Sequence, residues 1–108
     1  MTDQMTQFLD EYGQALHRAG ELGVQESYFE HLRKVAFSTA FKAAADGGEP
    51  ASKAEHTART APGYLDALKT LHQCQLEAAE AKAVAEHMKA RLEVWRTRSA
   101  DRRAKGAS

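Results

Sequence analysis

Residues 64–104 have the sequence YLDALKTLHQCQLEAAEAKAVAEHMKARLEVWRTRSADRRA, the longest uniform segment of the chain. It contains neither glycine nor proline, and it is dominated by alanine, leucine, glutamate, lysine and arginine, which are strong helix formers. The stretch therefore predicts one long helix. At 1.5 Å per residue this helix would span roughly 60 Å, so we expect part of it to meet another molecule or water.

Small and apolar residues recur along this helix in alternating steps of three and four, which is a heptad seam. The positions are Tyr64, Ala67, Leu71, Cys74, Ala78, Ala81, Ala85, Met88, Leu92, Trp95 and Ser99. The seam is longer than either shorter helix of the chain, so we expect the protein to form an oligomer. The predicted interface is Leu71, Cys74, Ala78, Ala81, Ala85, Met88 and Leu92. The alternative is a seam covered within the chain by the N-terminal helices.

Upstream of the long helix, apolar spacing predicts two shorter helices, over residues 3–18 and 26–45. Gly20 and Gly23 lie between them and predict a connector, because glycine supplies the backbone freedom that ends a helix. The second helix has a wide apolar arc, so we expect it to pack between the first helix and the long one.

The sequence DGGEP at 46–50 is the strongest loop signal in the chain and predicts a flexible joint. After it, Ser52 and Glu55 have the spacing of a capping box and predict the start of a short helix. Pro62 then predicts an interruption before the long helix. The expected organisation is all-α and a single domain: an N-terminal helical pair over 1–45, the joint over 46–50, and a helical segment over 51–108.

Composition limits the core and the setting of the protein. Isoleucine is absent and alanine supplies much of the apolar content, so the hydrophobic core is expected to be thin. The single Cys74 has no disulfide partner in the chain, and no secretory leader opens the sequence, so we expect a cytoplasmic location. No uncharged apolar run approaches the length that crosses a bilayer, so no membrane partner is expected.

The sequence carries no strong motif of catalysis. It has no phosphate-binding glycine loop, nucleophile elbow or zinc-protease signature. His72 and Cys74 are two residues apart, which places their side chains on different faces of a helix, so we expect no metal site there. We expect a protein that is not an enzyme and uses no cofactor.

The formal net charge of the chain is +0, but the charges are distributed unevenly. Most of the charged residues in 1–30 are acidic, and most of those in 89–108 are basic. The candidate nucleic-acid-binding residues of the basic end are Arg91, Trp95, Arg96, Arg98, Arg102, Arg103 and Lys105. Four of them, Arg91, Trp95, Arg98 and Arg102, share one helical face. Arginines bind phosphates while an exposed tryptophan stacks on a base, which is the combination that single-stranded nucleic acid requires. Alternatively, Trp95 is buried in the heptad seam, and the arginines are solvated or meet the acidic N-terminus of another subunit.

The segment LEVWRTRSADRRA, residues 92–104, together with the preceding KAEHTARTAPGYLDALKTLHQCQLEAAEAKAVAEHMKAR, resembles small helical proteins encoded by phages that are similar to UvsY-type recombination mediators. The matching features are Lys53 with the Ala54-Glu55-His56 stretch, Tyr64 and Leu68, the alanine-rich helix, and Trp95-Arg96 followed by a second arginine pair. The resemblance covers roughly the C-terminal half of the chain.

The resemblance implies an oligomer that binds single-stranded DNA and assists a recombinase or annealing protein, in the host cytoplasm if the chain is phage-encoded. By matching position, Arg91, Arg96, Arg98, Arg102 and Arg103 would contact phosphates. The competing hypothesis is a non-enzymatic helical interaction protein, such as a phage inhibitor or assembly chaperone, without affinity for nucleic acid.

Overall fold

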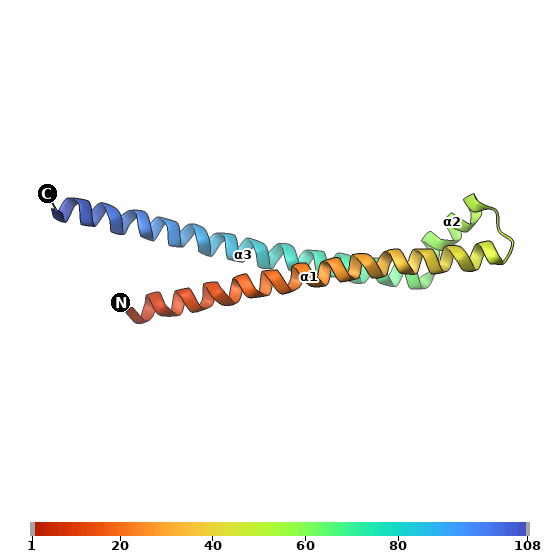
Figure 1. Cartoon of the computed structure of the whole chain (residues 1–108), viewed down its shortest axis with the longest axis horizontal. Helices are drawn as coiled ribbons and strands as arrows, with labels where there is room; N and C mark the ends of the chain where they lie inside the picture. The colour runs from red at the N-terminus through yellow and green to blue at the C-terminus, as the bar shows by residue number, and fades with distance from the viewer. Residues whose placement is uncertain (1, 108) are drawn as a thin grey trace. The chain divides into compact units, whose positions relative to one another are not determined.

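The computed structural model describes residues 2–107, and every element in that range is a helix. In chain order they are α1 (Thr2–Asp46), α2 (Ala51–Thr60) and α3 (Pro62–Ala107), as Figure 1 shows. The all-α prediction is confirmed. So is the long C-terminal helix, which begins two residues before the predicted stretch and ends three residues after it.

The contacts divide the chain into two compact units. The terminal unit combines residues up to Gly20 with residues from Ala79 onward, and the central unit comprises Glu21–Ala78. In the central unit α1 and α3 run antiparallel: the Cys74 thiol meets the Leu22 carbonyl, and Phe37 meets Tyr64 (Figure 1). In the terminal unit, the guanidinium of Arg91 on α3 lies over the ring of Phe8 on α1.

The prediction of two N-terminal helices is wrong, because α1 continues without a break from Thr2 to Asp46. Glycine inside a helix costs only about 0.5–1 kcal/mol relative to alanine and removes no hydrogen bond. Leu22, between Gly20 and Gly23, is buried. Burial of a leucine side chain contributes roughly 1.5–3 kcal/mol, which offsets the cost of the two glycines.

The turn that follows α1 lies within the predicted joint and ends the helix through backbone hydrogen bonds. The Glu49 amide donates to the Ala44 carbonyl at 3.2 Å, and the Gly48 amide donates to the Ala45 carbonyl at 3.0 Å. Gly48 has a φ of 92°, a left-handed conformation that glycine adopts without steric cost. This is the Schellman arrangement, which satisfies carbonyls left open at the end of a helix. The predicted mobility of the joint stays a prediction.

The predicted capping box at the start of α2 is wrong. Pro50, in an extended conformation, occupies the cap position without a side-chain hydrogen bond, and its carbonyl accepts the Ala54 amide at 2.9 Å. Glu55 pairs instead with Arg59, at 2.6 Å between Nη2 and Oε1. The Glu49 carboxylate accepts the Thr57 hydroxyl at 2.8 Å, which ties the turn to α2.

The interruption predicted at Pro62 is confirmed, since α2 ends at Thr60 and α3 begins at Pro62. Proline suits the first position of a helix because the amide hydrogen that it lacks has no partner there. The Ala61 carbonyl accepts the Leu65 amide at 3.0 Å and so joins the first turn of α3.

The buried side chains are few and mostly small. In the central unit they belong to Leu22, Ala54, Ala58, Leu71 and Cys74, and in the terminal unit to Ala81, Ala85, Met88 and Leu92. Ala54 and Ala58 are completely buried, which is consistent with a close approach of α2 to its neighbours. Among residues 3–106, no large side chain is fully buried, so the core is as thin as the composition predicts.

Candidate nucleic-acid interface

The basic end of α3 presents a shallow groove on one side of the helix. The groove has a volume of about 370 Å³ and is lined by His87, Ala90, Arg91, Val94, Trp95, Arg98 and Arg102. These residues follow each other in steps that return to one face of a helix, because α-helices have 3.6 residues per turn. We call this surface the Trp95 face.

Trp95 is the largest side chain of the face, and 47% of it is exposed. The sequence left open whether it is buried in the heptad seam, and in this structure it is not. The indole is therefore accessible to a planar ligand.

The three arginines of the Trp95 face have different surroundings. The Arg91 guanidinium carbon lies 5.1 Å from the centre of the Phe8 ring, a cation–π contact that orients the side chain. Arg98 and Arg102 are exposed, and within the described residues neither makes an ion pair or hydrogen bond through its guanidinium. Their donors are available to an anion.

The other predicted nucleic-acid-binding residues do not line this groove. Arg96 and Arg103 each follow a groove residue by one position, which turns them about 100° around the helix. The Arg103 Nε donates to the Ser99 carbonyl at 3.4 Å. Lys105 is exposed and also lies outside the groove. The structure thus brings together four of the seven predicted residues and adds His87, Ala90 and Val94, which were not predicted although His87 precedes Arg91 by one helical turn.

The predicted oligomer interface forms the inner side of α3. Leu71, Cys74, Ala81, Ala85, Met88 and Leu92 are buried within the single chain, and Ala78 is half-buried. This is the arrangement that the sequence analysis treated as the alternative, a seam covered within the chain. Whether a second copy also uses these residues stays a prediction.

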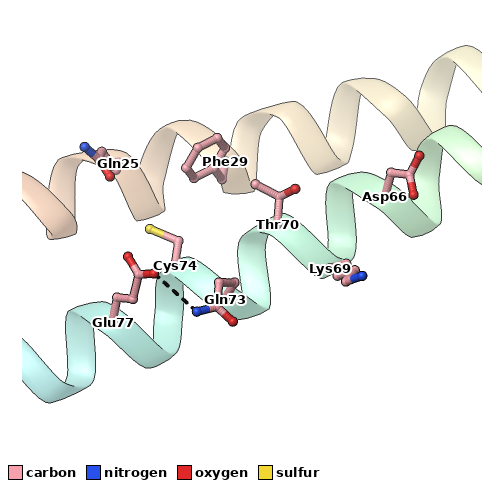
Figure 2. Close-up of a pocket in the computed structure, with 8 residues that line it drawn as sticks. All are labelled: Gln25, Phe29, Asp66, Lys69, Thr70, Gln73, Cys74 and Glu77. Atoms are coloured by element: carbon pink, nitrogen blue, oxygen red, sulfur yellow. Dashed lines mark hydrogen bonds between the residues drawn. The ribbon is translucent and has the colours of Figure 1, made fainter.

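A second groove surrounds Cys74 in the central unit (Figure 2). Its volume is about 550 Å³, and its walls are Gln25 and Phe29 from α1 with Asp66, Lys69, Thr70, Gln73, Cys74 and Glu77 from α3. Figure 2 shows Thr70 and the Cys74 sulfur pointing toward α1. The Gln73 amide donates to the Glu77 carboxylate at 3.2 Å.

The thiol of Cys74 is held in its protonated form. It donates to the Leu22 carbonyl, with 3.8 Å between sulfur and oxygen. Burial raises the pKa of the Cys74 thiol above its ordinary value of 9.0, and the carboxylates of Glu26 and Glu77 raise it further. A raised pKa reduces the thiolate fraction, and the thiolate is the reactive form. Cys74 therefore acts as a small packing residue.

Comparisons with family models, curated proteins and solved structures give no match to this chain. Across residues 2–107, no three histidine, cysteine, aspartate or glutamate side chains are grouped to hold a metal ion. In the same range, no helix combines the length and apolar character that crossing a bilayer requires.

Proposed function

We propose that the protein binds single-stranded DNA through the Trp95 face and acts as an accessory to recombination. The observation that carries the proposal is the exposed Trp95 beside Arg98 and Arg102 in one groove. A base that stacks on an exposed aromatic ring contributes about 1–3 kcal/mol and requires no particular sequence. The guanidinium groups of Arg98 and Arg102 on the same face suit the phosphates that flank such a base.

The assistance of a recombinase or annealing protein is the further part of the proposal. It rests on the resemblance of residues 53–104 to UvsY-type mediators, which bind single-stranded DNA and assist a recombinase or annealing protein. The alternative role, a helical interaction protein without nucleic-acid affinity, is favoured by an exposed apolar stripe on α1 that is described below. The two roles differ in their response to a single-stranded oligonucleotide.

The test is the binding of a fluorescently labelled oligonucleotide, followed by anisotropy over a range of salt concentrations. Each phosphate contact on a single strand contributes about −0.7 to the slope of log affinity against log salt. The double variant Arg98→Glu/Arg102→Glu removes two such contacts. We expect weaker binding and a slope that is flatter by about 1.4.

Two controls separate the Trp95 face from general charge. Lys34→Glu/Lys53→Glu changes the net charge equally at exposed positions of the central unit, and we expect it to leave the salt slope unchanged. Arg96→Glu/Arg103→Glu changes the same helix outside the groove, and we expect a smaller loss than for Arg98→Glu/Arg102→Glu. Equal losses in all three variants would show nonspecific attraction, and no binding of wild-type protein at low salt would favour the alternative role.

A further inference from the structure

In the central unit, α1 carries a second apolar face. Four residues at steps of four, four and three lie on one side of the helix, and each is exposed: Val24 by 72%, Tyr28 by 57%, Leu32 by 36% and Val35 by 45%. We call these four residues the α1 stripe. Apolar side chains that are exposed singly are ordinary, but a contiguous row marks an interaction surface.

The α1 stripe is separate from the side of α1 that packs within the chain. Leu22 and Phe37 contact residues of α3, and Phe29 lines the groove of Cys74. From the sequence, the wide apolar arc of residues 26–45 is expected to pack between a separate first helix and the long helix. The separate first helix does not exist, since α1 is continuous, and the stripe is left without its expected neighbour.

Charged residues lie beyond both ends of the α1 stripe, and their signs determine which orientation of a partner helix is favourable. Glu21, Tyr28, Val35 and Lys42 are spaced by seven residues each, so they form one position of a heptad repeat on α1. The row therefore reads acidic, apolar, apolar, basic. A second copy in antiparallel orientation places Glu21 opposite Lys42 and Tyr28 opposite Val35, while a parallel copy would place like charges together.

We propose that α1 of a second copy of this chain covers the α1 stripe, antiparallel and around a two-fold axis between His31 and Leu32. A two-fold interface uses the same patch on both subunits and must be complementary to itself. The heptad row of Glu21, Tyr28, Val35 and Lys42 meets this condition, because its two charges and its two apolar residues are each equidistant from that axis. This dimer uses a different surface from the heptad seam of α3, and it does not depend on DNA binding.

The first test is the molar mass at about 50 μM, a concentration at which micromolar complexes are populated, by sedimentation equilibrium. We expect twice the chain mass of 11.9 kDa for the wild type. Val35→Glu should weaken the dimer about tenfold or more, because it places an unpaired charge in the interface. The control Leu76→Glu changes an exposed leucine of α3 and should leave the mass unchanged. A monomeric wild type, or equal weakening by both variants, would overturn the proposal.

A charge exchange tests the antiparallel register. Glu21→Lys alone and Lys42→Glu alone each place like charges opposite each other, so each should weaken the dimer, and the two changes together should restore it. Lys34→Glu, an exposed charge reversal on another side of α1, should have no effect. Circular dichroism of every variant checks that the helices persist. Additive weakening in the double variant would contradict this register.

Crosslinking tests the axis itself in a Cys74→Ala background. With a short bismaleimide, Leu32→Cys should give crosslinked dimers, because the two copies of that position lie beside the axis. Lys42→Cys should not, because its two copies lie far from the axis and on opposite sides of it. Efficient crosslinking at both positions would indicate parallel helices and would overturn the arrangement.

Discussion

At the residue scale, Trp95 shows what a heptad pattern leaves undecided. Its spacing places it in line with Met88 and Leu92, which are buried, yet nearly half of Trp95 is exposed. A heptad predicts which residues share a face, but burial also requires a partner at the same level. Here the Trp95 ring is only partly covered, although Leu92, three residues earlier, is buried. The heptad pattern predicts the face of α3 on which Trp95 lies. The exposure of the ring depends on how the neighbouring helix is aligned with it.

If Trp95 stacks on a base, Trp95→Ala should reduce the affinity for single-stranded oligonucleotide by about 1–3 kcal/mol. The ring is half exposed, so the melting temperature should change little. Val84→Ala, at an exposed position of the same helix outside the groove, is the matched control and should bind nearly as the wild type does. A fall in melting temperature without loss of affinity would instead assign Trp95 to packing.

Cys74 gives a prediction about pH. Its pKa in the folded chain lies above 9.0, so the unfolded chain loses the thiol proton first as pH rises. The stability that this group contributes is complete below pH 9.0 and is lost as pH rises through the folded pKa. We expect slow modification by a thiol reagent at pH 8, and a fall in the free energy of unfolding above pH 9.0 that Cys74→Ala reduces. Rapid modification of the folded protein at pH 8 would contradict the protected thiol.

At the element scale, the helix interruptions were predicted well where proline or a left-handed glycine forces them. Pro62 and the Gly47-Gly48 turn lie where the sequence placed a break. Gly20 and Gly23 were misread, because glycine permits a turn without requiring one. The predicted capping box is absent because the Pro50 carbonyl accepts the first amide hydrogen bond of α2, so the helix already begins before Ser52.

Substitutions of glycine by alanine should separate the two kinds of position. Gly23 lies inside α1, and an added Cβ meets no atom within 4 Å, so Gly23→Ala should stabilise the chain by about 0.4–1 kcal/mol. Gly48 has a φ of 92°, so Gly48→Ala should destabilise it by about 1 kcal/mol or more. Urea titration followed by circular dichroism measures both changes. Destabilisation by Gly23→Ala would indicate that α1 bends or opens at this glycine in solution.

For the molecule as a whole, the sequence predicts the helical class and the residues on the inner face of α3. It does not predict how the contacts divide between the central and the terminal unit. Alanine-rich seams predict close helix packing but do not distinguish a helix of the same chain from one of another copy. In the structure α1 continues through Gly20 and Gly23 and contributes residues to both units, so the seam is covered within the chain. Whether a second copy also packs on the seam stays a prediction.

Ala85, which is 6% exposed in the terminal unit, provides a test of which helix covers the alanine seam. Within a chain that covers Ala85 with its own α1, Ala85→Leu overpacks the contact and should lower the free energy of unfolding by about 1–3 kcal/mol. Ala83→Leu, at an exposed position two residues away, should change it by less than about 0.5 kcal/mol. Unfolding is measured at one fixed protein concentration, because association also contributes to stability. The molar mass of Ala85→Leu should equal that of the wild type. A lower mass with unchanged stability would show instead that the α3 seam joins two copies, as its length first indicated.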